Sequence, residues 1–308
     1  MGLKIIAGSL FLAAVVFACP GTGAWAQGVN LFPAPGSESS GEREMKALAS
    51  AYPDRISKAA QVDGDWALDV DGQWFFWAQG RILLESQRAH PESYSRFRFY
   101  PYLLGGLPPL PQLDATTTAR LKQALKESRA HPPRRSEDFL GCLYDASSRK
   151  ETESHIVTVD FMGFPVRVHQ RIAGPLADVA AECSTLRKAD PQAAAFFGSL
   201  SEVDGFNYRD VAGTATRSYH SYGLALDLIP RSYGGKAVYW RWVMEKAGEK
   251  ADDWWTTPYD QRWMVPLSVV NIFEKHGFVW GGKWLFFDTI HFEYRPEIFI
   301  LAKQQVTP

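Results

Sequence analysis

The chain has 308 residues, of which 46% are hydrophobic and 14% are aromatic, enough apolar side chains to fill a sizeable core. This composition excludes a disordered protein. Lys and Arg number 33 and Asp and Glu number 34, which leaves a formal net charge of −1. No overall field draws such a chain to nucleic acid or to anionic lipid, so we expect neither as a partner and look for a small or neutral polymeric substrate.

Residues 1–26 have the composition of an export signal peptide. Lys4 precedes an apolar run over residues 5–18, and Ala24 and Ala26 form a small-x-small cleavage site. The apolar run is too short to span a bilayer comfortably, so we expect no transmembrane segment in the mature chain. The sequence therefore predicts an exported protein, periplasmic or associated with the cell envelope.

The three cysteines leave two alternatives open. Cys19 could instead become the acylated first residue of a lipoprotein, but Phe17 is bulky for that processing site, so simple secretion is preferred. Cleavage after Ala26 leaves Cys142 and Cys183, which in an exported protein are either bridged or two buried thiols. Neither has a Cys or His neighbour at zinc-finger spacing, so we expect no thiolate metal site.

The first half of the chain has few functional signals. Residues 27–44 are rich in Gly, Ser and Pro, which predicts a flexible leader. Residues 45–150 form an N-terminal extension that is either a module for binding the cell wall or a packed extension. Within it, two apolar stretches joined at Asp71-Gly72 predict a β-hairpin, and residues 114–130 predict a capped helix.

The second half, residues 151–308, has a more regular pattern. Residues 155–172 are β-branched and apolar on both sides of a Met-Gly pair, which predicts a second hairpin. Apolar residues recur at helical spacing in residues 176–188 and 266–277, and strand-like stretches follow. We therefore predict an α+β fold in which a small antiparallel sheet packs against helices.

His220 and Asp227 lie seven residues apart around a Gly-x-Ala step, in a chain with only seven histidines. In a straight strand, at about 3.3 Å per residue, they would lie roughly 23 Å apart and could not share an ion. Gly223 permits a bend, because glycine adopts backbone angles that other residues avoid. We expect His220 on a loop that folds back toward Asp227; the alternative is an ordinary strand with polar ends.

A second segment offers the other half of a site, with Asp288, His291 and Glu293 close together. A zinc hydrolase needs three protein ligands, an open position for water and a carboxylate that takes a proton from that water. His220, Asp227 and His291 would be the ligands, and Asp288 would be the base. Each segment alone is weak evidence, since a single His at the end of a strand is more often a packed residue.

Two motifs occur in order, Ser218-x-His220-x-x-Gly223-x-Ala225-x-Asp227 and Asp288-x-x-His291-Phe292-Glu293. Together with residues 205–213 and the segment WGGKW, they resemble the M15 zinc peptidases, which include D-alanyl-D-alanine carboxypeptidases, dipeptidases and L-alanyl-D-glutamate endopeptidases acting on bacterial wall peptides. The resemblance covers about residues 205–296, within a predicted M15-like zinc peptidase domain of residues 151–308. It implies a zinc site at the edge of the small antiparallel sheet. It implies the same three Zn²⁺ ligands and the same base, although some relatives have Glu at the position of Asp288.

The resemblance also suggests roles for three further residues. Arg209 matches the family arginine that polarises the scissile carbonyl, where negative charge builds during attack. Ser218 matches a position that hydrogen-bonds the substrate peptide, although a turn-stabilising role is equally open. Glu293 either orients a ligand histidine or pairs with Arg295.

Seven tryptophans fall between Trp240 and Trp284. Core packing is the expected role for most of them. Trp280 and Trp284 flank a Gly-Gly pair just before the predicted base, so we expect these two at the rim of a substrate cleft.

The sequence thus predicts an exported zinc metallopeptidase that hydrolyses a bond in the peptidoglycan stem peptide, of the D-alanyl-D-alanine carboxypeptidase type. L-alanyl-D-glutamate endopeptidase specificity is the alternative within this class. A zinc-containing wall-binding protein that has lost turnover is the alternative from another class, and the intact Asp288 argues against it. A lysostaphin-like enzyme is disfavoured because the chain has no His-x-His pair.

Overall fold

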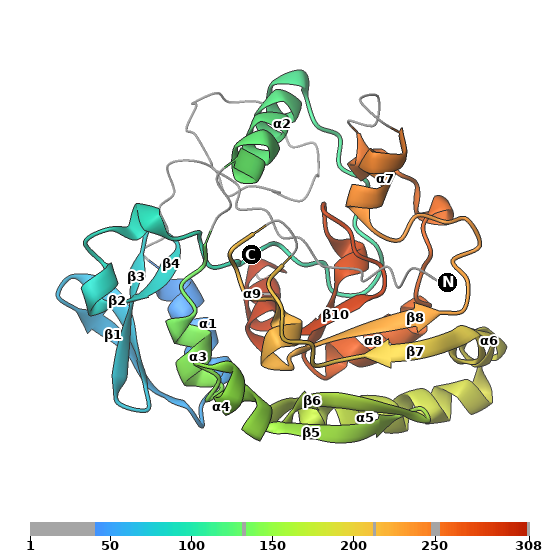
Figure 1. Cartoon of the computed structure of the whole chain (residues 1–308), viewed down its shortest axis with the longest axis horizontal. Helices are drawn as coiled ribbons and strands as arrows, with labels where there is room; N and C mark the ends of the chain where they lie inside the picture. The colour runs from blue at the N-terminus through green and yellow to red at the C-terminus, as the bar shows by residue number, and fades with distance from the viewer. Residues whose placement is uncertain (1–40, 131–133, 212–213, 248–252, 307–308) are drawn as a thin grey trace.

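The computed structural model describes residues 41–130, 134–211, 214–247 and 253–306. The predicted export signal over residues 1–26, the alternative lipid site at Cys19 and most of the predicted leader lie outside the described residues. The end of that leader is an exception, since helix α1 begins at Glu42. Within the described residues, two four-stranded antiparallel sheets and a two-stranded hairpin combine with helices, which confirms the α+β class (Figure 1).

Helices and strands are interspersed along the described residues. The helices are α1 Glu42–Ala51, α2 Ala115–Ala130, α3 Asp138–Leu143, α4 Arg149–Ser154, α5 Gln170–Ala189, α6 Pro191–Ser199, α7 Trp240–Ala247, α8 Leu267–Lys275 and α9 Pro296–Val306. The strands are β1 Ile56–Val62, β2 Asp65–Val70, β3 Gln73–Ala78, β4 Arg81–Leu84, β5 Ile156–Phe161, β6 Phe164–His169, β7 Leu200–Asp204, β8 Ala225–Pro230, β9 Phe278–Trp280 and β10 His291–Tyr294.

Strands β1 to β4 form a meander at one end of the molecule (Figure 1). The predicted hairpin at Asp71-Gly72 is confirmed, with φ of 49° and 87° at its two turn residues. Two successive positive φ angles are typical of the type I′ turn, whose twist matches that of the strands it joins. Asp63-Gly64 and Gln79-Gly80 repeat this geometry, so β1 and β4 extend the hairpin into a sheet that the sequence pattern did not predict in full.

The second sheet has the strand order β7-β8-β10-β9, with every pair antiparallel. Its strands β8 and β10 are the two central ones. On one face, Phe292 of β10 stacks on Phe273 of α8 with ring centroids 4.1 Å apart. The predicted helix over residues 266–277 is confirmed as α8, and the helix over residues 176–188 is confirmed as part of α5, which begins earlier, at Gln170.

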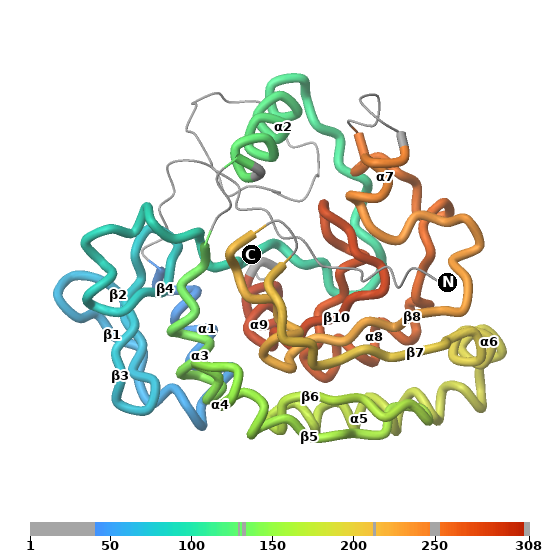
Figure 2. Tube along the Cα trace, viewed as in Figure 1, coloured from blue at the N-terminus to red at the C-terminus, as the bar shows by residue number. Residues whose placement is uncertain are grey.

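One hydrophobic cluster continues across residue 150. It contains Met45, Leu68 and Phe139 from the first half of the chain together with Val179 and Phe273 from the second. Helices α3 and α4 follow α2 in the chain and lead into the hairpin of β5 and β6 (Figure 2). The N-terminal region and the sheet of β7 to β10 therefore share one core.

The two cysteines in the described residues are free thiols. Cys183 is completely buried in α5, and burial raises its pKa to about 12. Of the two alternatives from the sequence, the unbridged one is therefore present. Among the described helices, none has both the length and the apolar character needed to cross a bilayer.

A buried ion pair in the second half of the chain forms hydrogen bonds with residues of the first half. Lys283 Nζ lies 2.5 Å from Glu274 Oε1, and the hydroxyl of Tyr102 donates a 2.6 Å hydrogen bond to the same oxygen. Lys283 also donates to the carbonyl of Leu103 at 2.9 Å. Burial lowers the pKa of Lys283, and Glu274 opposes that shift, so the ammonium depends on its carboxylate partner.

We expect Lys283→Met to lower the free energy of unfolding by about 3 kcal/mol, because it leaves the buried Glu274 without its cation. The double variant Lys283→Met/Glu274→Gln should recover part of that loss. The exposed pair of Lys46 and Glu42, 2.5 Å apart, provides a control, and Lys46→Met should cost less than about 1 kcal/mol. Urea denaturation followed by circular dichroism measures the free energy of unfolding of all three variants. Equal losses of that free energy in Lys283→Met and Lys46→Met would contradict the prediction.

Candidate metal and catalytic site

The bend that the sequence predicts near His220 is present. Ser218 caps the short 3-10 helix Tyr219–Tyr222, and its Oγ accepts a 3.3 Å hydrogen bond from the backbone N–H of His220. Gly223 ends this helix with a φ of 68°. A Cβ at this position would lie 2.6 Å from the backbone nitrogen of His169, so the position needs glycine for its conformation and for its space.

Three side chains meet beyond this bend: His220, Asp227 of β8 and His291 of β10. The register of β8 and β10 places His291 directly opposite Asp227. His291 Nδ1 lies 2.8 Å from Asp227 Oδ1, and His220 Nε2 lies 3.2 Å from each of these two atoms. Asp227 and His291 lie on the two central strands, His291 at the start of β10, and His220 lies on the 3-10 helix that precedes β8. The predicted metal site is therefore at the end of the central strands and not on an outer strand.

The other ring nitrogen of each histidine has its own partner. His220 Nδ1 lies 2.6 Å from the carbonyl of Gly205, which can only accept a hydrogen bond, so this nitrogen carries the proton. His291 Nε2 lies 3.2 Å from Glu293 Oε1. Such contacts fix the orientation of a ligand ring and the nitrogen that it presents to a metal.

The charges of the site are strongly coupled. Burial by itself would raise the pKa of Asp227, but His220 and His291 outweigh burial and hold it well below its usual range. Burial by itself would lower the pKa of His291, but the hydrogen bonds to Asp227 and Glu293 raise it to about 10. Two carboxylates around one imidazole thus create a strongly negative environment that attracts a cation.

This donor set fits a zinc ion. Zinc binds imidazole nitrogen and carboxylate oxygen at about 2.0–2.2 Å, and tetrahedral ligands at that range lie about 3.3 Å from one another. The three donor atoms, separated by 2.8 to 3.2 Å, already approximate one face of such a tetrahedron. His220, Asp227 and His291 could therefore hold zinc with a fourth position left for water.

Asp288 is buried next to this group. Its carbonyl accepts a hydrogen bond from the backbone N–H of His291 at 3.3 Å, and its own N–H donates to the carbonyl of Gly281 at 3.1 Å. The hydroxyl of Tyr233 is near both Asp227 and Asp288, which raise its pKa in addition to the effect of burial. The neighbourhood of Asp288 suits the predicted base, and that role stays a prediction.

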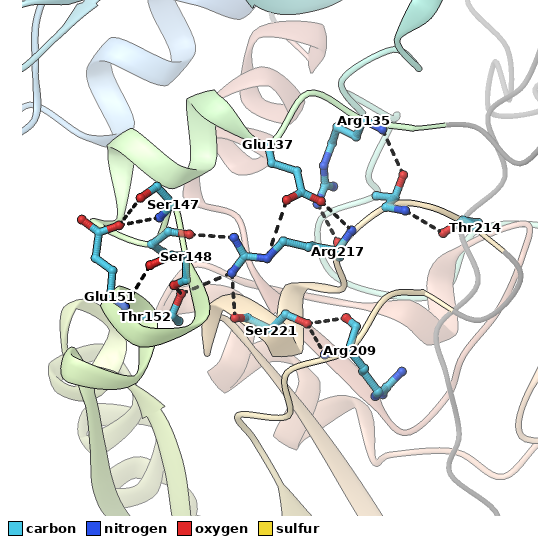
Figure 3. Close-up of polar contacts among 12 residues, drawn as sticks. Arg135, Glu137, Ser147, Ser148, Glu151, Thr152, Arg209, Thr214, Arg217 and Ser221 are labelled. Carbon is cyan, nitrogen blue, oxygen red and sulfur yellow. Dashed lines mark hydrogen bonds and ion pairs between the residues drawn. The ribbon is translucent and has the colours of Figure 1, made fainter.

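Arg209 is half-buried and is held through its backbone. Its N–H donates a 2.7 Å hydrogen bond to Ser221 Oγ, and the same hydroxyl donates to the Arg209 carbonyl. The Arg209 side chain points away from Ser221 and from the buried Arg217 (Figure 3). Burial raises the pKa of Asp204, which lies opposite Asp227 in the pairing of β7 with β8, and the charges of His220 and Arg209 oppose that shift.

Two residues predicted to contact substrate, Trp280 and Ser218, are buried in the structure. Trp280 is completely buried, with its indole N–H donating to the Thr289 carbonyl at 2.8 Å, so its predicted place at a cleft rim is wrong. Three-residue strand β9 turns this ring into the core against Phe292. Ser218 is 1% exposed and caps a helix, which supports its turn-stabilising alternative.

Trp284 and Glu293 both lie beside His291. Trp284 is half-buried, and its ring centroid is 5.7 Å from that of the histidine. Glu293 contacts the His291 ring and also lies 3.8 Å from Arg295 Nη1, so its two alternative roles are present together.

Three residues of the site were missed: Asp204, Ser221 and Tyr233. Asp204 lies opposite Asp227 in the pairing of β7 with β8. Ser221 holds the backbone of Arg209, and Tyr233 lies near the two site carboxylates. Ser221 lies inside the first motif but at one of its unspecified positions, so the motif did not single it out; the other two depend on strand register and loop packing.

Comparison with known protein families gives one match that contains the site. An M15 peptidase family model described as D-alanyl-D-alanine carboxypeptidase matches residues 212–294, and a second model, described as a domain of unknown function, matches residues 44–99. The chain is 37% identical over 82 residues to the peptidoglycan L-alanyl-D-glutamate endopeptidase CwlK of Bacillus subtilis. That alignment covers 26% of this chain and 40% of CwlK, so the chain spans less than half of that relative. No solved structure matches the chain.

The M15 match contains His220, Asp227, Asp288 and His291, and Arg209 lies just outside it. The match to the family model thus agrees with the motifs and with the geometry of the three buried side chains. Residues 212–294 of the chain are therefore similar to the M15 peptidase family.

Proposed function

We propose that this protein is a zinc-dependent peptidase that hydrolyses a peptide bond in the stem peptides of peptidoglycan. The observation that carries the proposal is the set of three donor atoms within 3.2 Å of one another, in the segment that matches the M15 family. The relative CwlK, which is named as a peptidoglycan endopeptidase, supports this substrate class.

In the proposed reaction, zinc held by His220, Asp227 and His291 would act as a Lewis acid and lower the pKa of water to about 7. Asp288 accepts the proton of the attacking water and later delivers it to the leaving amine. Arg209 stabilises the negative charge that develops on the carbonyl oxygen, because its guanidinium stays protonated. Glu293 and the Gly205 carbonyl keep the two histidine rings in their orientations.

We propose D-alanyl-D-alanine carboxypeptidase specificity, in line with the description of the matching family, with L-alanyl-D-glutamate endopeptidase specificity as the alternative. The predicted export signal over residues 1–26, or a lipid anchor at Cys19, would bring the enzyme to a substrate outside the cytoplasm. Mass spectrometry of muropeptides digested by the zinc-loaded protein tests the specificity. Loss of one terminal alanine supports the first specificity, internal cleavage supports the second, and intact muropeptides would exclude the proposal.

The metal assignment predicts about one zinc per chain. The double variant His220→Ala/His291→Ala should lose it, because only one carboxylate ligand is left. His276→Ala is a matched control, since His276 lies at the end of α8 and contacts Glu182 instead. Elemental analysis after gel filtration measures the occupancy, and full zinc content in the double variant would rule out these ligands.

Asp288→Asn tests the base. The substitution removes the proton acceptor and keeps the side-chain shape, so we expect zinc to stay bound while kcat falls by a factor of about 10² to 10⁴. Asp178→Asn, on the exposed face of α5, should leave both quantities unchanged. Parental turnover by Asp288→Asn would remove Asp288 from the reaction, and complete inactivity of the parent would favour a wall-binding protein.

Arg209→Lys tests the stabilisation of charge on the carbonyl oxygen. Lysine keeps the positive charge but lacks the planar guanidinium with its paired N–H donors. We therefore expect kcat/KM to fall by a factor of about 10² while zinc stays bound. Arg187→Lys, on the exposed end of α5, serves as the control. If Arg209→Ala cleaves the stem peptide at the parental rate, Arg209 has no part in the chemistry.

A further inference from the structure

Residues 97–105, which we call the bridging segment, extend from the N-terminal region onto the sheet that carries the metal site. The carbonyl of Arg98 accepts a 2.6 Å hydrogen bond from Arg295 Nη2. The hydroxyl of Tyr102 accepts one from the backbone N–H of Trp280 at 2.9 Å, and the carbonyl of Leu103 accepts one from Lys283. The segment is therefore fixed to β9 and to the end of β10.

Arg295 connects this segment to Glu293. It is 2% exposed, its Nε donates to Glu297 Oε1, and its Nη1 lies 3.8 Å from Glu293 Oε2. Its guanidinium lies 5.2 Å from the ring centroid of Phe97 and 5.9 Å from that of Tyr100. Two aromatic rings and one carbonyl of the bridging segment thus hold the cation that faces Glu293.

Glu293 passes this constraint to a proposed metal ligand. Its Oε1 lies 3.2 Å from His291 Nε2, which leaves His291 Nδ1 directed at Asp227. A carboxylate that contacts the second nitrogen of a ligand histidine fixes the ring and strengthens it as a donor. The position of Arg295 therefore affects how well His291 can bind a metal.

A second path of contact reaches His291 through Trp284. The ring of Tyr100 packs edge-on against Trp284, with centroids 5.6 Å apart, and Trp284 lies 5.7 Å from the His291 ring. The hydroxyl of Tyr100 has no hydrogen-bond partner among the described residues. The ring of Tyr100, and not its hydroxyl, therefore makes the contact with Trp284.

We propose that Arg295 and the bridging segment are positioning elements for His291, so that the N-terminal region completes the metal site. This assigns a role to the region that contains the match to a domain of unknown function over residues 44–99, which the sequence left as either a wall-binding module or a packed extension. The inference rests on the proposed zinc site, and it goes beyond that site by making its affinity depend on residues outside the M15 match.

Arg295→Lys is the first test. Lysine keeps a positive charge beside Glu293 and Glu297, but its single ammonium group cannot also donate a hydrogen bond to the Arg98 carbonyl as the planar guanidinium does. Glu293 and His291 would then be held less firmly, so we expect zinc affinity to fall by about tenfold or more. Arg55→Lys is the control, because Arg55 likewise bonds a carboxylate, Asp145, at 2.5 Å and a carbonyl, Cys142, at 2.7 Å, with no path to the site. Competition against a chromophoric chelator measures the zinc affinity of each full-length protein.

The second test uses two substitutions of Tyr100. Tyr100→Leu removes the ring that contacts Arg295 and Trp284, and we expect weaker zinc binding and a lower kcat with KM little changed. Tyr100→Phe removes only the hydroxyl, so its zinc affinity and its kcat should equal those of the parent. If Tyr100→Leu binds zinc as tightly as the parent, the bridging segment does not position His291.

Circular dichroism of the zinc-free proteins separates positioning from folding. A variant with the parental melting temperature and weakened zinc binding supports the inference, and parental zinc affinity in Arg295→Lys overturns it. If Arg295→Lys does not fold, the Tyr100 pair decides the question. A parent that binds zinc no better than His220→Ala/His291→Ala would instead overturn the proposed function, so the two failures are distinguishable.

Discussion

The antiparallel pairing of β8 with β10 is the constraint on which the rest of the site depends. It places His291 opposite Asp227, and it places Phe292 and Leu226, the next residue pair, on the core face. Side chains alternate along a strand, so a slip of one residue would exchange the faces on which the polar pair and the apolar pair lie. The stacking of Phe292 on Phe273 thus preserves the register that brings the metal-binding atoms together.

The same strand leads into a run of buried charges. Glu293, Arg295 and Glu297 follow His291 at every second position, and each has a partner. The hydroxyl of Tyr52 donates to Glu297 at 3.0 Å, so this run ends on the N-terminal helix region. Buried charges are tolerated only when paired, because desolvation costs several kcal/mol per ion. This stretch therefore holds its geometry only while the N-terminal region is packed against it.

Local signals accounted for much of the fold and for the centre of the site. The turn at Asp71-Gly72, the helix of residues 115–130 and the bend at Gly223 follow from backbone preferences that a short window contains. The convergence of His220 with His291, 71 residues apart, was predicted from two motifs that need a common ion.

The burial of Trp280 could not be predicted, because it depends on which face of a three-residue strand meets the core. The bond from Arg295 to the Arg98 carbonyl spans 197 residues and uses a backbone atom, which leaves no trace in side-chain identity.

The shared core across residue 150 has a consequence for how such chains change over time. The boundaries of the two family matches, at residues 99 and 212, do not mark separate folding units, because Phe139 and Met45 belong to the same cluster as Phe273. A substitution in one of the two regions changes the packing and the charges that surround side chains of the other region. Exchanging only the M15-like region for that of a relative would therefore replace one side of this shared core and leave the N-terminal side chains packed against a different surface.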